Sequence, residues 1–188
     1  MKRAVLVNGV PASGKSTVAR AVSAKFGWPL LGLDAIKEPF FEQLGMGDRE
    51  YNRKLGRASY AAIFNLIAAF PAGSTAVIDA WFGFQPLDVL SSHLAHAEIS
   101  DVVEIWCYAD PRRIGDRYAA RVTTRPAGHP GLDYVPELIA LAGRAQPTGL
   151  FAWIGIDTDR PLDEAGLLTW LTEQFGLYRH DDAGRIGP

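Results

Sequence analysis

The sequence predicts an α/β protein built on a doubly wound parallel sheet. Three observations indicate this class: five short apolar runs of strand length, amphipathic stretches of helical length between them, and a glycine-rich segment directly after the first run. Strands that are apolar throughout, without alternation, are typical of a sheet covered by helices on both faces. The expected strands are residues 4–8, 30–34, 75–80, 102–108 and 151–157.

Helical patterns fill most of the sequence between these strands. Val18, Val22 and Phe26 recur every four residues, which predicts a first helix that stops before Gly27. Three of the later helical stretches open with proline, which the first turn of a helix tolerates. These later helices are expected over residues 49–70, 86–97, 111–123, 135–144 and 161–175.

The length of 188 residues suits one domain that needs neither disulfides nor a metal for stability. Cys107 is the single cysteine and is expected to be an inert core residue. We expect a domain over residues 1–176, a lid inserted at about residues 111–134, and a polar tail at residues 177–188.

The apolar runs are too short for a membrane span, which requires about 18 consecutive apolar residues. The first run is broken by Asn8, Gly9 and Pro11, so it does not resemble a signal peptide. A cytoplasmic protein without a membrane partner is therefore expected.

The formal charge of -2 argues against general attraction to nucleic acid. Its distribution is nevertheless uneven, because no lysine or arginine occurs between Arg57 and Arg112, and five arginines then follow up to Arg125.

The segment "NGVPASGKST" contains the pattern Gly9-x-x-x-x-Gly14-Lys15-Ser16 between a predicted strand and a predicted helix. In such a loop the backbone amides hold phosphates, the lysine reaches the β- and γ-phosphates, and the Ser16 hydroxyl binds Mg²⁺. A purely structural glycine turn is the alternative, which the strand–loop–helix setting disfavours. The sequence thus predicts ATP and Mg²⁺ as ligands, with nucleotide contacts from Gly9, Ala12, Ser13, Gly14, Lys15, Ser16 and Thr17.

Two further carboxylates end predicted strands. Asp79 could orient the magnesium ion or its water, or simply solvate the end of the third strand. Asp34 ends the second strand at the sheet edge where ligands bind, so we expect it to act as general base toward an acceptor hydroxyl. Asp34 could also be the N-cap of a helix beginning at Ala35, and the two roles are compatible.

Arg113, Arg117 and Arg121 are spaced by four residues and would share one face of a helix, with Arg125 in the following turn. A solvated basic face is the alternative, but Asp116 is the only acid among them. We expect a lid that carries these arginines to the triphosphate, with Arg117 and Arg121 as catalytic contacts.

The segments "NGVPASGKST", "LGLDAIKEPF", "AVIDAW", "DPRRIGDRYAAR", "HPGLDY" and "IDTDRPLDE" resemble, in this order, the chloramphenicol phosphotransferase-like kinases of the P-loop superfamily. Zeta-toxin-like, gluconate-kinase-like and polynucleotide-kinase-like proteins share much of the plan. The resemblance implies a three-layer fold whose five parallel strands have the order 2-3-1-4-5, Asp34 as base and the arginine helix as lid. It also suggests that Asp159 and Arg160, in "DTDRP", border the adenine.

The segments after the second and third strands are rich in aromatic residues. Phe41, Trp81 and Phe84 are candidates for stacking on the acceptor, although aromatic residues beside a sheet more often belong to the core. His129 is expected to be a surface residue, and the pair His93 and His96 lacks the partners of a zinc site.

The sequence therefore predicts an ATP-dependent phosphotransferase acting on a hydroxyl of a small, antibiotic- or sugar-like molecule. A polynucleotide 5′-hydroxyl kinase is the alternative enzyme; it would need a basic groove, for which residues 58–111 offer no lysine or arginine. A non-catalytic ATP-binding regulatory module is the alternative from another class. The sequence assigns neither the acceptor nor the oligomeric state.

Overall fold

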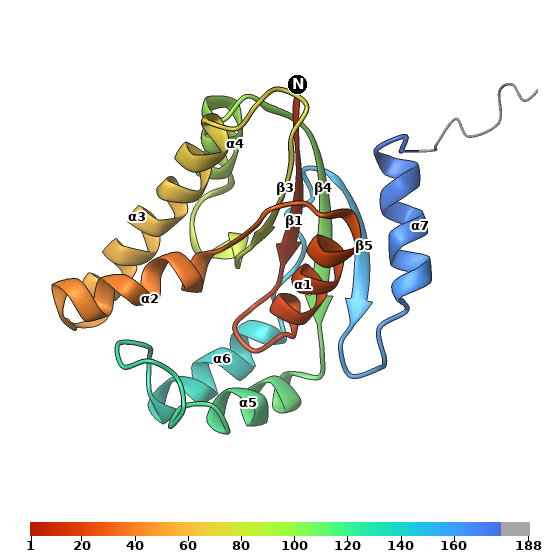
Figure 1. The fold of residues 1–188 in the computed structure, drawn as a ribbon. Coiled ribbons are helices and arrows are strands. Elements are labelled where there is room, and N and C mark those ends of the chain that lie inside the picture. Colours follow the sequence, from red (N-terminus) through yellow and green to blue (C-terminus); the bar gives the residue numbers. More distant parts are fainter. Residues whose placement is uncertain (178–188) are drawn as a thin grey trace, which may run out of the picture.

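The computed structural model of the protein describes residues 1–177 and contains one five-stranded parallel sheet (Figure 1). The strand order β2-β3-β1-β4-β5 confirms the predicted topology. The polar tail predicted for residues 177–188 lies, beyond Leu177, outside the described residues. The strands are β1 (Lys2–Asn8), β2 (Leu30–Gly32), β3 (Thr75–Asp79), β4 (Ile99–Tyr108) and β5 (Ala152–Asp157).

Helices cover both faces of this sheet, as the unbroken apolar strands predicted (Figure 1). Helices α1 (Lys15–Phe26) and α7 (Glu164–Gln174) bury one face, where Val5, Val7 and Ile105 meet Val22 and Leu171. Helices α3 (Arg49–Ala68) and α4 (Leu87–His96) bury the other. The two apolar clusters give the sheet a fixed position between rigid layers.

Three helices surround the carboxyl ends of the strands instead of covering a face (Figure 1). They are α2 (Leu33–Leu44), α5 (Pro111–Ala119) and α6 (Val135–Ala142). Helices α5 and α6 pack closely at Gly115, where a Cβ atom would lie 2.7 Å from Ile139 Cδ1. Two short 3₁₀ turns, Phe82–Phe84 and Leu132–Tyr134, complete this end of the molecule.

Several predicted boundaries differ by a few residues, and two of these differences affect the site. Strand β2 ends at Gly32, so Leu33 and Asp34 belong to the first turn of α2. Helix α5 ends at Ala119 and not near residue 123, because the Arg121 amide turns back to the Tyr118 carbonyl in a tighter i→i+3 bond. Arg121 therefore lies beyond the helix whose face it was expected to share.

No helix among residues 1–177 is both long and apolar enough to cross a lipid bilayer.

A buried polar cluster fixes the end of β1 relative to its neighbours. The Asn8 amide donates to Glu104 Oε1 at 2.7 Å, and its oxygen accepts the amides of Gly9 and Phe82 at 2.8 and 3.0 Å. Glu104 in turn accepts the amide and hydroxyl of Thr148. Asn8 and Glu104 are 1% and 0% exposed, so their partners have no water to replace a lost bond.

We expect Asn8→Ala to lower the free energy of unfolding by on the order of 3 kcal/mol, because three buried groups lose their partner at once. Urea denaturation followed by circular dichroism measures the change. Asn65→Ala is the control, since it breaks an exposed bond to His96 and should cost below about 0.5 kcal/mol. Equal losses in the two variants would contradict a structural role for the buried amide.

Candidate active site

The carboxyl edge of the sheet carries a cleft of about 530 Å³. The loop before α1 forms one side, and helices α2 and α3 form the other. The segment after β3, the residues from Tyr118 to Tyr134 and helix α6 supply the remaining walls. The cleft thus lies at the edge where ligands bind in open parallel sheets.

The phosphate loop has the backbone that its glycines predicted. Gly9 has φ 155°, and a Cβ atom there would lie 2.5 Å from the Cys107 carbonyl oxygen. Gly14 has φ 84° and caps α1 without any side chain, which leaves the amides of the first helical turn available to a phosphate. Ala12 also has a positive φ, at 66°, and so holds the loop in a conformation that non-glycine residues rarely adopt.

Most of the phosphate-loop residues that were predicted to contact the nucleotide border the cleft. Gly9 and Ser13 do not, because both are buried behind the loop. The members that line the cleft are Ala12, Gly14, Lys15, Ser16 and Thr17.

The predicted magnesium residues, Ser16 and Asp79, both line the cleft. Asp79 Oδ1 is buried and has no hydrogen-bond partner among residues 1–177. A buried carboxylate oxygen without a donor suits a hard cation or a water bound to it. The two residues therefore fit a magnesium ion held with a nucleotide.

Asp34 lies in the first turn of α2 and lines the same cleft as Lys15. Gly32 is the N-cap, so the alternative that Asp34 caps this helix is wrong. Burial raises the pKa of the Asp34 carboxyl. Lys15, His129, Arg125 and Lys37 lower the pKa by more than burial raises it, so the net pKa lies below the ordinary value of 3.8. Asp34 is therefore ionised at neutral pH.

The residues after α5 reach across the cleft and dock on α2 and α3. Arg125 Nη2 lies 3.1 Å from Asp34 Oδ2, and His129 Nε2 lies 2.9 Å from Glu38 Oε1. The Gly128 carbonyl accepts a hydrogen bond from the Asn52 amide. We refer to residues 111–134 as the lid; in this structure its segment after α5 lies across the cleft at Asp34.

His129 is not the surface residue that the sequence predicted. Its side chain is only 5% exposed, and its ring contacts Phe41 edge to face at 5.6 Å between centroids. Burial lowers the pKa of His129, and nearby Arg125 and Lys37 lower it further, against the opposing effect of Asp34 and Glu38. The imidazole therefore favours the neutral form.

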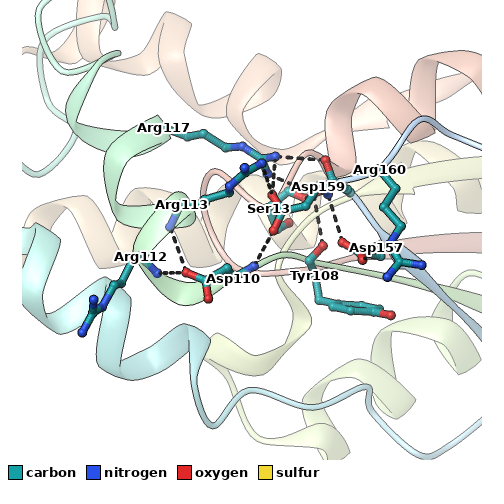
Figure 2. A network of polar contacts seen from close by, with 10 residues as sticks. Ser13, Tyr108, Asp110, Arg112, Arg113, Arg117, Asp157, Asp159 and Arg160 are labelled. Carbon is teal, nitrogen blue, oxygen red and sulfur yellow. Dashed lines mark hydrogen bonds and ion pairs between the residues drawn. The ribbon is translucent and has the colours of Figure 1, made fainter.

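Arg117 does not point into the cleft, contrary to the expected role at the triphosphate. Figure 2 shows it reaching the segment after β5, where it donates to the Thr158 hydroxyl and carbonyl at 3.0 and 2.9 Å and contacts Asp159 Oδ1 at 2.8 Å. The Thr158 hydroxyl also bonds the Ser13 carbonyl at 2.8 Å. Arg117 consequently ties the start of the lid to the back of the phosphate loop.

The other predicted nucleotide residues near this network also lie away from the cleft lining. Arg113 is exposed and lies 3.6 Å from Asp159 Oδ1, and Arg160 pairs with Asp157 at 3.1 Å (Figure 2). Asp159 accepts the Asp110 amide at 2.8 Å. Of the three arginines expected on one helix face, only Arg121 lines the cleft.

The predicted acceptor aromatics divide into two groups. Trp81 and Phe84 line the cleft. Phe41 is 6% exposed and does not line it, because it packs beneath the lid at Gly128, where a Cβ atom would lie 2.8 Å from its ring. Phe41 therefore supports the closed lid.

The cleft is strongly basic, although the chain as a whole has a charge of -2. Contrary to the expectation from residues 58–111, a basic groove is present, because its cations come from α2, the N-terminal part of α3, the lid and the end of α6. The i, i+4 spacing of Arg49, Arg53 and Arg57 was a signal that the sequence analysis did not use. The carboxylates lining the cleft are Asp34, Asp79 and Glu137, and the cations are Lys15, Arg20, Lys37, Arg49, Arg53, Arg57, Arg121, Arg125 and Arg144.

We expect the closed lid to lose stability as the pH falls below 6.5, because His129 must then take up a proton beside Arg125 and Lys37. The unfolded chain binds this proton near pH 6.5 and the folded chain only at lower pH, so stability present above 6.5 is lost as the pH falls through the lowered pKa. Urea denaturation between about pH 8 and pH 5 should show a shallower decline for His129→Gln than for the wild type. Parallel declines would contradict this assignment.

Similar folds occur in solved structures of kinases. A candidate kinase from Chloroflexus aurantiacus J-10-fl has a TM-score of 0.74 at 24% identity, with 92% of this chain and 98% of that chain covered. A gluconokinase from Sinorhizobium meliloti 1021 gives 0.57 at 19% identity, covering 94% and 97%. The shikimate kinase of Acinetobacter baumannii, in complex with shikimate, gives 0.58 at 12% identity, covering 94% and 93%. These likenesses show the α/β fold of P-loop kinases.

No curated protein sequence matches this chain significantly. The model of the AAA_33 family, described as an AAA domain, matches residues 5–131, which is more than half of the chain. The match includes the phosphate loop, Asp34, Asp79 and the lid up to Gly131. The protein therefore belongs to the AAA_33 family.

Proposed function

We propose that the protein is an ATP-dependent kinase that transfers the γ-phosphoryl group to a hydroxyl of a small molecule. The observation that carries the proposal is the placement of Lys15 and Asp34 in one cleft beneath a basic lid. A phosphate loop alone would suit many nucleotide-binding proteins. An ionised carboxylate that lines the same cleft as the loop adds the second group that phosphoryl transfer requires.

In this proposal the phosphate loop and Lys15 hold the donor phosphates, and Ser16 and Asp79 hold magnesium with its water. ATP bound with magnesium supplies the phosphoryl group. The acceptor oxygen forms its bond to phosphorus in line, the bond to the leaving ADP oxygen breaks, and the acceptor proton passes to Asp34. Asp34 is suited to this step because it is ionised, and because Arg125 occupies Oδ2 while no described residue bonds Oδ1.

The lid has two roles in the same proposal. Arg121 faces the cleft and would neutralise charge on the transferring group, a contribution of about 10³- to 10⁵-fold where arginines play this part. The contacts of Gly128 and His129 with α2 and α3 would exclude water that otherwise competes with the acceptor.

A polynucleotide 5′-hydroxyl kinase is a second candidate, favoured by one observation, the excess of cations in the cleft. The position of the lid argues against a polynucleotide acceptor. Its contacts with α2 and α3 cross the cleft in which a nucleic-acid strand would have to lie. A non-catalytic ATP-binding module is supported less well, since a sensor has no evident use for an ionised carboxylate opposite the phosphate loop.

We expect Asp34→Asn to lower kcat by about 10²- to 10⁴-fold while ATP binding is retained, because the amide keeps the shape but accepts no proton. Lys15→Ala should instead weaken ATP binding directly. ADP release with and without a panel of hydroxylated compounds measures turnover, and calorimetry measures binding. Normal turnover in Asp34→Asn would remove the assigned base, and ATP binding without turnover under every condition would favour the regulatory module.

We expect Arg121→Ala to lower kcat by about 10³-fold or more, because its guanidinium faces the reacting group. Arg117→Ala should act differently, since it breaks the contacts with Thr158 and Asp159 and thereby loosens the phosphate loop. Its main effects should be a lower melting temperature and a higher KM for ATP. Steady-state kinetics and thermal melting of both variants separate these outcomes; a similar kcat loss in both would return Arg117 to the catalytic role.

A further inference from the structure

The wall of the cleft formed by α2 and α3 carries cations that the transfer chemistry does not use. Helices α2 and α3 meet at the end that lies away from the sheet (Figure 1), and Lys37, Arg49, Arg53 and Arg57 line the cleft from them. In the proposed function, the phosphate loop on the other side of the cleft and Arg121 bind the donor phosphates. The cations of this wall therefore need a separate explanation.

Two of the four are neutralised within the protein. Arg49 pairs with Glu137 across the cleft mouth, and Arg57 pairs with Glu50 at 3.0 Å. Lys37 and Arg53 make no hydrogen bond or ion pair with any side chain or carbonyl of residues 1–177. They are the two positive charges on this wall without an anionic partner among residues 1–177, although the Lys37 ammonium lies over the Phe41 ring at 5.3 Å to the centroid.

Lys37 is the more informative of the two, because it is only 8% exposed. The contact with the Phe41 ring supplies no counter-charge, and burial together with nearby Arg125 lowers the pKa of Lys37 although Asp34 and Glu38 raise it. Those carboxylates are already bonded to Arg125 and His129. An anionic ligand in the cleft would supply the partner that the protein does not.

The position of Lys37 indicates where that anion would lie. Lys37 follows Asp34 by three residues, which is about one helical turn, so its ammonium is offered beside the reacting hydroxyl and not at the donor phosphates. Arg53 faces the same space from α3, and the Gln85 amide nitrogen is buried in the cleft without an acceptor among the described residues. Trp81 and Phe84 provide the apolar side of the same space.

We propose that the phosphoryl acceptor is a small hydroxylated anion, whose carboxylate or phosphate group is bound by Lys37 and Arg53. The role of this anion as phosphoryl acceptor rests on the proposed kinase function. The anion-binding site itself does not depend on turnover. The proposed acceptor is therefore not a neutral sugar or antibiotic. It carries one negatively charged group, which lies about one turn of α2 away from the reacting hydroxyl.

The site is tested first by binding, with ADP and Mg²⁺ present so that the donor side is filled. Inorganic phosphate and malate are titrated against the wild type, Lys37→Gln, Arg53→Gln and the control Lys54→Gln, and the melting temperature is recorded. Lys54 is exposed on α3 next to Arg53 but does not line the cleft. We expect stabilisation in the wild type and in Lys54→Gln, and its loss in the other two.

No stabilisation by either anion, or equal stabilisation in all four proteins, would overturn the anion site. Malate and phosphate give the two arms that distinguish a carboxylate from a phosphate group. If Lys37→Gln fails to fold, Lys37→Arg keeps the charge and should restore anion binding, whereas failure of a folded Lys37→Arg to bind would count against the assignment.

Turnover provides the second test, with pairs of acceptors that differ only in charge: gluconate and glucitol, shikimate and its methyl ester, glucose 6-phosphate and glucose. The charged member should be preferred, and Lys37→Gln and Arg53→Gln should raise its KM by about 10- to 100-fold, the expected loss of a charged hydrogen bond, with the KM for ATP unchanged. Equal use of neutral acceptors would overturn the inference while leaving the kinase intact. Preference for a 5′-hydroxyl oligonucleotide would overturn the small acceptor, and anion binding without any turnover would contradict the kinase proposal alone.

Discussion

The side chain of Asn8 holds the two halves of the site in register. It is the last residue of β1, and its amide oxygen accepts one hydrogen bond from the phosphate loop at Gly9 and one from the segment after β3 at Phe82. Its nitrogen is fixed by Glu104 on the neighbouring strand. Because all these groups are buried, the separation between the phosphate loop and the segment after β3 is set by the sheet and not by loop flexibility.

The excess of positive charge in the cleft favours anionic ligands. Cations outnumber carboxylates there, and this mutual repulsion is relieved only in part by the pairs that Arg49, Arg57 and Arg125 make. The same field lowers the pKa of the Asp34 carboxyl, whose side chain is 54% exposed, and so keeps it ionised. A site of this kind gains most when phosphates enter it, because each phosphate oxygen then replaces repulsion by a charge-assisted hydrogen bond.

The sequence predicted those parts of the fold that depend on local pattern. The apolar runs identified the strands, and the glycine spacing of the phosphate loop identified both its backbone and its place before α1. Asp34 was placed on the correct edge of the sheet, but its helix was not, because a strand ending and a helix beginning within three residues leave the same apolar signal, and Pro39 interrupts the helical pattern.

Contacts between distant segments could not be predicted in this way. His129 and Glu38 are separated by 91 residues, as are Arg125 and Asp34, and nothing local distinguishes these residues from solvated ones. The mistaken row of lid arginines has a different cause. Four-residue spacing places side chains on one face only while the helix continues, and α5 stops two residues before Arg121.

The end of α5 also determines how the lid works. Arg117 binds Thr158, which binds the carbonyl of Ser13, so the helical part of the lid is fastened to the phosphate loop itself. The part that spans the cleft is the segment after Ala119, and it is anchored at its far side by contacts with α2 and α3 around Asp34. The lid is therefore held at both ends, at α5 and at its contacts with α2 and α3, and these contacts determine its position over the cleft. In this position the lid places Arg121 and Arg125 at the cleft, where Arg125 contacts Asp34 of α2.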